Sequence, residues 1–279
     1  MVFDAPAVLP ALLTPFDEGG AVATGPLAEH VDYLIEAGVD GIMPCGSTGE
    51  TALLEADEVL TVVRTVVDAA GGRVPVIAHV GRPSTPATVR LIEEAIAAGA
   101  DGVSAVVPYY YAYGDDQIVA HYRALLEVAG ETPLLAYTFP ARTGNKLSAE
   151  AFRTLVGEGL AGLKDSTSDP EVHRSYLEAA PDAQIFVGSP SFLLESLRGG
   201  SRGGVAALAN LRPELVLALA HAWRDGDDEA AERLQEEVRA AEKALAQEPP
   251  LVALKRGVSE LLAERGSSYP AALRSPLGA

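Results

Sequence analysis

Short apolar runs alternate with amphipathic segments from the N-terminus to about residue 224. The apolar runs are brief and rich in β-branched residues, which is typical of parallel strands that are buried on both faces. They lie at residues 8–13, 41–44, 74–80, 102–107, 134–137, 162–164, 184–187 and 204–208. Between them, apolar residues recur at helical spacing and several segments end in glycine. These helical segments include residues 26–36, 57–70, 85–98, 116–129, 149–156 and 213–223.

Eight strand–helix units in succession predict an α/β fold, a (β/α)8 TIM barrel. The alternative is a doubly wound open sheet, which usually carries a glycine-rich dinucleotide-binding turn after its first strand. Thr14-Pro15-Phe16-Asp17 stands at that place instead. After Trp223 the pattern is purely helical, at residues 227–247 and 251–265 with Pro249-Pro250 between them. We therefore expect a catalytic barrel at residues 1–224 and a C-terminal helical extension at residues 225–279 packed on it.

Composition narrows the function classes. The 279 residues include 21 basic and 39 acidic side chains, a formal net charge of −18, and no basic stripe, which excludes nucleic-acid binding. The single cysteine, Cys45, allows no internal disulfide and fits a reducing cytosol. The N-terminus lacks the pattern of a signal peptide, and no apolar run approaches the roughly 18 residues of a membrane span. We expect a cytoplasmic protein that does not contact membranes.

Polar, protonatable residues follow four of the predicted strands. In a TIM barrel the active site forms at the C-terminal ends of the strands, so these residues are candidates for its chemistry. A purely structural barrel would not be expected to carry them there. The four strand ends read Cys45-Gly46-Ser47-Thr48-Gly49-Glu50, Pro108-Tyr109-Tyr110-Tyr111, Tyr137-Thr138-Phe139-Pro140-Ala141-Arg142-Thr143-Gly144 and Lys164-Asp165-Ser166.

Lys164 is the most informative of these residues. The chain has only four lysines, which are Lys146, Lys164, Lys243 and Lys255. Lys164 follows an apolar strand, so its amine should project into the barrel mouth, where burial lowers its pKa. A neutral amine can attack a ketone and form a Schiff base. From position alone, a lysine that is paired with Asp165 or another carboxylate and has no chemical role is equally compatible.

The other candidates each allow two interpretations. Tyr137 could exchange a proton beside the amine, or it could be a core tyrosine bonded to the backbone. Ser47 and Thr48, which lie between glycines, could bind a small anion or form an ordinary turn. Arg142 could clamp a carboxylate or be a solvated loop charge.

Tyr109, Tyr110 and Tyr111 hold three of the nine tyrosines, and a packing or subunit contact is their alternative role. Five scattered histidines and one cysteine show no metal-ligand spacing, and no phosphate-binding loop motif occurs. The sequence thus indicates neither a metal site nor a nucleotide site.

Taken together, these motifs resemble the dihydrodipicolinate synthase/N-acetylneuraminate lyase family of pyruvate-dependent class I aldolases. The resemblance runs nearly end to end, and its specificity comes from the order of the motifs on consecutive strands. They are Leu13-Thr14-Pro15-Phe16, Gly46-Ser47-Thr48-Gly49-Glu50, Pro108-Tyr109-Tyr110, Tyr137-x-x-Pro140, Gly162-Leu163-Lys164-Asp165, Gly188 and Gly204-Val205-Ala206.

The resemblance implies a role for each matching residue. Lys164 matches the lysine that forms an imine with pyruvate, and Tyr137 matches the tyrosine that shuttles protons. Ser47 and Thr48 match the hydroxyl pair that holds the pyruvate carboxylate, with Ser47 also in a proton relay. Tyr110 matches a second relay tyrosine that reaches into a neighbouring subunit.

Two further residues match substrate-binding positions of the family. Val205 matches a strand residue whose backbone carbonyl faces the catalytic centre, and Gly188 matches the glycine that follows the seventh barrel strand. The family uses neither a metal nor an organic cofactor. It also suggests a homotetramer built as a dimer of dimers.

The subfamily depends on the acceptor aldehyde. Arg142 resembles the arginine with which the synthases bind the carboxylate of aspartate semialdehyde, and this favours 4-hydroxy-tetrahydrodipicolinate synthase-type condensation. Ser47 stands where the synthases typically have threonine and matches the sialic-acid lyases. Three further departures from the synthase pattern are Tyr111 in place of asparagine, Thr138 in place of asparagine, and Ser189-Pro190 in place of acidic residues.

We therefore expect a Schiff-base-forming lyase or synthase that acts on a small 2-keto acid and an aldehyde. The alternatives are a 2-keto-3-deoxy sugar acid aldolase or dehydratase and a sialic-acid-lyase-like enzyme. A non-catalytic binding barrel is a further alternative, although it would be expected to lose Lys164 or Tyr137.

Overall fold

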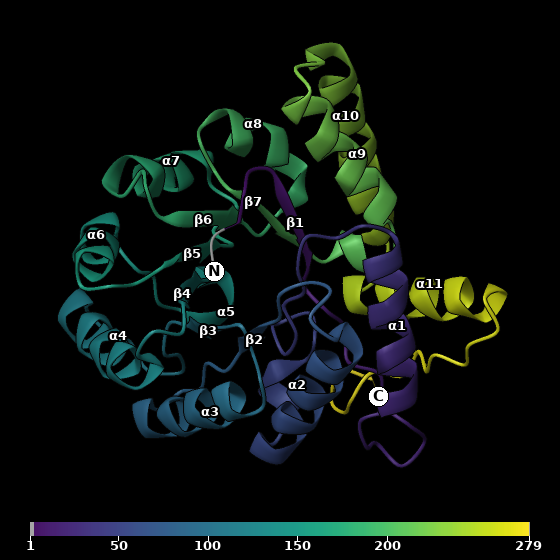
Figure 1. The fold of residues 1–279 in the computed structure, drawn as a ribbon, viewed down its shortest axis with the longest axis horizontal. Helices are drawn as coiled ribbons and strands as arrows, with labels where there is room; N and C mark the ends of the chain where they lie inside the picture. Colours follow the sequence, from purple (N-terminus) through teal and green to yellow (C-terminus); the bar gives the residue numbers. More distant parts are fainter. Residues whose placement is uncertain (1–2, 279) are drawn as a thin grey trace.

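The central feature of the fold is one parallel sheet that curls into a ring. The computed structural model describes residues 3–278, and seven of its strands pair in the order β1-β7-β6-β5-β4-β3-β2. Figure 1 shows this ring at the centre with the helices around its outside. The strands are β1 (Ala7–Pro10), β2 (Ile77–His79), β3 (Gly102–Val106), β4 (Leu134–Thr138), β5 (Gly162–Asp165), β6 (Gln184–Val187) and β7 (Gly203–Ala206).

Residues 41–44 close the ring between β1 and β2, at the place of the second predicted strand. They form isolated parallel bridges, from Met43 to Ala11 and from Ile42 to Val76, in place of a regular strand. Backbone hydrogen bonds of 2.9 to 3.1 Å run on both sides of this segment. The predicted TIM barrel is confirmed, with its second strand reduced to these bridges.

Helices cover the outer face of the ring and bury their apolar stripes against it. Local chemistry sets several of their starts: the Ser148 side chain accepts from a backbone N–H at the first turn of α6, and Asp169 does the same for α7. The helices are α1 (Thr24–Glu36), α2 (Ala56–Ala70), α3 (Thr85–Ala97), α4 (Asp115–Ala129), the short α5 (Pro140–Thr143), α6 (Ala149–Gly157), α7 (Pro170–Ala179), α8 (Leu193–Arg198) and α9 (Pro213–Arg224). Short 3-10 turns occupy Thr51–Leu53, Pro190–Phe192 and Leu208–Asn210.

Apolar side chains fill the inside of the ring. Phe3 and Phe186 meet edge to face with ring centroids 5.6 Å apart, and Leu9, Met43 and Val205 complete this buried layer. This apolar layer reaches the level of Lys164, because Phe186 lies opposite Lys164 in the register of the sheet.

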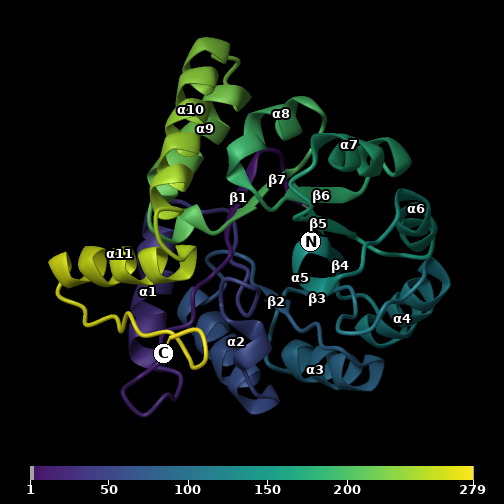
Figure 2. The ribbon, with the colours of Figure 1, turned by 180° about the vertical axis from the view of Figure 1, so that it is seen from behind.

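The chain continues past the barrel into α10 (Asp228–Leu245), which packs against α9, and α11 (Pro250–Glu264). These are the two helices expected after residue 224, and Figure 2 shows them and the tail that follows from behind. The division of the chain at that residue stays a prediction. Among residues 3–278, no helix has both the length and the apolar character needed to cross a membrane.

Candidate active site

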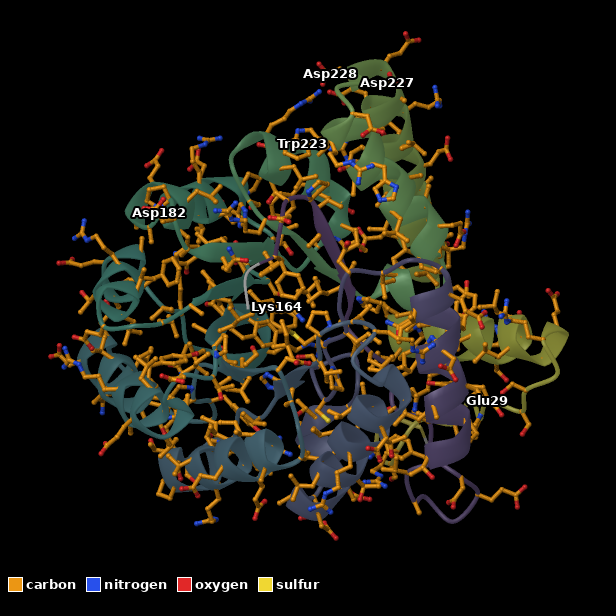
Figure 3. The ribbon with its side chains drawn as sticks, viewed as in Figure 1. Glu29, Lys164, Asp182, Trp223, Asp227 and Asp228 are labelled. Carbon is orange, nitrogen blue, oxygen red and sulfur yellow. The ribbon has the colours of Figure 1, made fainter. Side chains whose placement is uncertain are left out.

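Strand pairing places Lys164 beside Tyr137. In the register of the sheet, Lys164 of β5 lies opposite Tyr137 of β4 on one side and Phe186 of β6 on the other. The Lys164 side chain is only 3% exposed, and Figure 3 shows it near the centre of the ring. The Lys164 side chain is therefore buried within the barrel, at the end of β5.

The Lys164 amine contacts a thioether and the face of an aromatic ring. Its Nζ contacts the Met43 Sδ at 3.9 Å and lies 4.5 Å from the centroid of the Tyr137 ring. Burial lowers the pKa of Lys164 to about 7, because an ammonium without water is disfavoured. At neutral pH the amine of Lys164 is therefore neutral in a far larger share of the molecules than a solvated lysine would be.

Asp165 does not pair with this amine. Its Oδ2 accepts a hydrogen bond from His173 Nδ1 at 2.8 Å, and its Oδ1 accepts one from the Thr167 backbone N–H at 2.8 Å. His173 Nε2 is in turn 2.7 Å from the Ser201 hydroxyl. Successive side chains of a strand point to opposite faces, so Asp165 faces α7 while Lys164 faces the barrel interior. Asp165, the first carboxylate considered as a partner for Lys164, is therefore not paired with it.

Tyr137 is joined to Ser47 across the barrel mouth. Its side chain is buried, and its hydroxyl lies 3.3 Å from the Ser47 hydroxyl, although 90 residues separate the two in sequence. Burial raises the pKa of Tyr137, while hydrogen bonding by Ser47 and Ser166 and the charge of Arg142 oppose this rise. The phenol therefore stays protonated at neutral pH and can act as a proton donor.

Ser47 and Thr48 occupy a tight turn whose hydroxyls are half-buried. The Gly49 N–H donates to the Gly46 carbonyl at 3.0 Å, and the Thr14 hydroxyl donates to the Gly49 carbonyl at 2.9 Å. The structure thus brings Ser47 to Tyr137 and leaves Thr48 next to it at the mouth.

Tyr110 and Arg142 lie at the surface. The Tyr110 side chain is 85% exposed, has a positive φ of 82°, and packs edge to face on Tyr111 at 5.1 Å. Arg142 is exposed on α5, yet its charge acts on the pKa of Tyr137. Within one chain, the structure therefore separates Tyr110 from the group around Lys164 and leaves Arg142 near the rim.

Val205 lies inside the barrel, whereas Gly188 lies in the loop that follows β6. Val205 is buried in the apolar layer that also holds Met43. Gly188 follows β6 and donates its N–H to the Asp165 carbonyl at 2.6 Å. A Cβ at Gly188 would lie 2.0 Å from the Ser166 Oγ, so only glycine leaves the Ser166 hydroxyl its present position beside Tyr137.

His79 is a site residue that the sequence analysis missed. It ends β2, is fully buried, and meets the Tyr137 ring edge to face at 5.5 Å. Burial, and then the charges of Lys164 and Arg82, lower the pKa of His79 to about 3, so the ring stays neutral. The sequence does carry a signal for it: His79 is the one polar residue in the apolar run 74–80, and it lies two positions after Ile77, hence on the same face of the strand.

Comparison with known proteins identifies the family of this barrel. The Dihydrodipicolinate synthetase family matches residues 4–279. The chain is 40% identical over 271 residues to an uncharacterized DapA-like lyase of Halobacterium salinarum, covering 97% of this chain and 87% of that protein. It is 36% identical over 281 residues to a 4-hydroxy-tetrahydrodipicolinate synthase of Methanopyrus kandleri, covering 99% and 92%. It is also 35% identical over 231 residues to an N-acetylneuraminate lyase of an Enterobacter species, covering 82% and 78%.

Solved structures agree with this assignment. A prophage protein of E. coli that belongs to the dihydrodipicolinic acid synthase family, solved in complex with pyruvate, superposes with a TM-score of 0.91 at 27% identity and covers 97% of this chain and 91% of that one. Dihydrodipicolinate synthase from Aquifex aeolicus gives a TM-score of 0.90 at 27% identity, with the same coverage of 97% and 91%. On sequence and on fold, this chain belongs to the dihydrodipicolinate synthetase family, whose relatives named here are lyases and synthases.

Proposed function

We propose that this protein activates pyruvate as an enamine on Lys164 and joins it to an aldehyde, or releases it together with one. The observation that carries the proposal is the buried Lys164 amine, whose pKa is lowered to about 7, beside the phenol of Tyr137. A relative solved in complex with pyruvate supports the choice of keto acid.

The proposed reaction begins when the neutral Lys164 amine adds to the ketone carbon of pyruvate. Loss of water gives an iminium, and loss of a methyl proton then gives the enamine, whose carbon attacks the carbonyl carbon of the aldehyde. Hydrolysis of the resulting iminium frees the amine and the product, and the reverse sequence cleaves a longer 2-keto acid. The imine nitrogen accepts the electron pair in these steps, so the proposal uses no cofactor and no metal.

Neighbouring groups supply protons and hold the keto acid. In the proposal, Tyr137 gives a proton to the oxygen that leaves as water, and Ser47, 3.3 Å away, continues the relay. The hydroxyls of Ser47 and Thr48, with the backbone N–H groups of their turn, bind the carboxylate. The family resemblance adds the backbone of Val205 and of Gly188 as further candidate contacts for the substrate.

The acceptor is proposed to carry a carboxylate. Arg142 is exposed on α5, and its charge opposes the rise in the pKa of Tyr137, which supports a role for Arg142 near the reacting groups. This supports condensation with aspartate semialdehyde, as in the 36% identical synthase. The second candidate is cleavage of a sialic acid or a 2-keto-3-deoxy sugar acid, supported by Ser47 and by the 35% identical N-acetylneuraminate lyase.

A second copy of the chain is proposed to complete the relay. Tyr110 is exposed and stands with Tyr111 on an aromatic surface that a partner could cover. Aromatic residues are enriched at subunit interfaces. We therefore propose a homotetramer in which Tyr110 reaches the Ser47 of a neighbouring subunit.

Borohydride trapping tests the central step. Reduction of the protein in the presence of pyruvate should add the mass of the reduced imine to the peptide that contains Lys164. The Lys164→Ala variant should give neither adduct nor turnover. A wild-type protein that gains no mass on this peptide refutes the mechanism. Parallel assays with pyruvate and aspartate semialdehyde, glyceraldehyde or N-acetylmannosamine, run in both directions, then identify the acceptor.

A further inference from the structure

A buried ion pair lies behind the turn that carries Ser47 and Thr48. Lys255 of α11 places its Nζ 2.5 Å from the Glu50 Oε1, and both side chains are fully buried. The Lys255 Nζ also donates to the Ala272 carbonyl at 2.7 Å. The pair therefore joins the C-terminal extension to the loop of the proposed carboxylate site, through a lysine that has no part in the proposed reaction.

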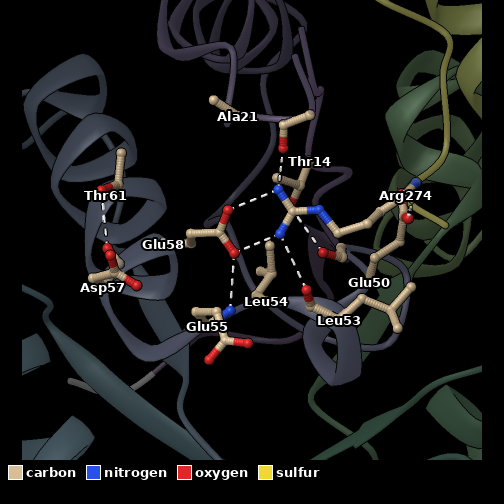
Figure 4. A network of polar contacts seen from close by, with 12 residues as sticks. Thr14, Ala21, Glu50, Leu53, Leu54, Glu55, Asp57, Glu58, Thr61 and Arg274 are labelled. Carbon is tan, nitrogen blue, oxygen red and sulfur yellow. Dashed lines mark hydrogen bonds and ion pairs between the residues drawn. The ribbon is translucent and has the colours of Figure 1, made fainter. Parts of the chain in front are cut away.

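The C-terminal tail binds the other oxygen of the Glu50 carboxylate. The Glu50 Oε2 accepts a hydrogen bond from the Arg274 backbone N–H at 2.9 Å. The Arg274 guanidinium pairs with both carboxylate oxygens of Glu58 and donates to the Leu53 carbonyl at 3.1 Å, as Figure 4 shows. The tail is thus fixed to α2 and to the 3-10 turn that follows Glu50.

The backbone of this loop needs such anchoring. Cys45 and Glu50, at its two ends, both have φ near +60°, a conformation that residues with a side chain rarely adopt. Residues in such conformations persist where their surroundings hold them. The Glu50 N–H donates to the Ser47 carbonyl at 3.2 Å, so the conformation of Glu50 sets the turn on which Ser47 stands.

The buried Lys255–Glu50 ion pair contributes little net stability to a fold. Removing two charges from water costs free energy that their mutual attraction often does not fully return, and apolar residues of similar volume are often at least as stabilising. Burial lowers the pKa of Lys255 while the nearby Glu50 opposes this. Placement of the loop is a function that an apolar replacement would not supply.

We propose that Lys255 and Arg274 are positioning residues, which hold Glu50 in its left-handed conformation and thereby hold Ser47 at Tyr137. The C-terminal extension is then part of the active-site machinery. The assignment of a substrate carboxylate to Ser47 and Thr48 rests on the proposed function, whereas the anchoring of the loop does not.

The test compares Lys255→Met with the double variant Glu50→Gln/Lys255→Met. The single variant leaves a buried carboxylate without its cation and should lower Tm, and the double variant removes that charge and should regain Tm. Arg123→Met, which breaks the exposed pair of Arg123 with Glu158, is the matched control and should behave as wild type.

Two readouts separate positioning from stability. In the double variant, the pyruvate concentration for half-maximal borohydride trapping should rise about tenfold or more, because a carboxylate site displaced by a fraction of an ångström binds poorly. Amide hydrogen exchange in the peptide 45–51 should accelerate in the double variant, while exchange in the β5 peptide stays unchanged. A double variant that regains Tm, pyruvate dependence and loop protection together overturns the proposal. The exchange readout needs no ligand, so a wild type without an adduct would refute the proposed function alone.

Discussion

Replacement of Lys164 by methionine should stabilise the fold while it abolishes catalysis. The pKa of this amine is about 7 in the folded protein, against an ordinary value of 10.5 that applies to the unfolded chain. One pKa unit corresponds to about 1.4 kcal/mol, so at pH 7 the buried amine costs the wild type about 4 kcal/mol. Methionine fills a similar volume and carries no proton, so Lys164→Met should recover most of this cost.

The cost has a defined pH dependence. Because the folded pKa lies below the unfolded one, the unfolded chain binds more protons between about pH 7 and pH 10.5, and wild-type stability rises with pH through that window. The advantage of Lys164→Met should therefore fall from about 4 kcal/mol at pH 7 to about 2 kcal/mol at pH 9. His79 and Tyr137, the titratable neighbours, do not titrate in this interval, since the pKa of His79 is about 3 and that of Tyr137 is raised above 10.

Equilibrium urea unfolding at pH 7 and pH 9 measures this difference. The fluorescence of Trp223, the single tryptophan, and far-UV circular dichroism should give coincident transitions. Lys146→Met, at an exposed position, is the control and should change stability by less than about 0.5 kcal/mol at either pH. A stability difference between Lys164→Met and wild type that is the same at both pH values would contradict a depressed amine pKa.

Three further predictions concern the residues around the amine. Ser47→Ala removes a hydrogen bond that lowers the pKa of Tyr137, so the alkaline limb of the pH–rate profile should move to higher pH. The same change should lower kcat about a hundredfold. An alkaline limb that stays at the same pH argues against a contact between Ser47 and Tyr137. Arg142→Ala should raise KM for a carboxylate-bearing aldehyde far more than KM for pyruvate, and equal effects on both substrates speak against the acceptor clamp. Gly188→Ala should cost about 1 to 3 kcal/mol and slow turnover, mainly through its clash with the Ser166 hydroxyl, and Ser166→Ala in the same chain should restore part of the stability but not the rate. If thermal unfolding shows that the double variant regains no stability over Gly188→Ala, the clash is not with the Ser166 hydroxyl.

Hydrophobic periodicity was sufficient to predict the barrel. Apolar runs buried on both faces and amphipathic helices between them are local signals, and each predicted run holds a strand or, at residues 41–44, a bridged segment. The lengths of the strands were not predictable. The run 74–80 yields only Ile77–His79, and the run 204–208 is a strand only to Ala206 before a 3-10 turn begins at Leu208. Strand ends depend on which neighbour offers hydrogen bonds, and that neighbour lies far away in sequence.

The candidate site also has a part that the sequence predicts and a part that only the folded structure shows. Lys164 and Tyr137 could be predicted because both end apolar runs, and consecutive parallel strands bring their C-terminal ends together. The contact of Tyr137 with Ser47 spans 90 residues, and the edge-to-face packing of His79 on Tyr137 spans 58, so no local pattern reports them. The side of β5 from which Asp165 projects follows from strand alternation, yet its partner His173 could be identified only from the packing of α7.

The sequence by itself determined the fold class and the family and indicated candidate residues for imine chemistry, because periodicity and motif order are properties of the chain alone. The tertiary structure alone decided the properties on which function depends. A pKa of about 7 for Lys164 comes from the water that its neighbours exclude, and those neighbours come from several separate strands. Likewise, Lys255 in the sequence is one more helix lysine, and only the folded chain brings it to Glu50 behind the proposed substrate loop.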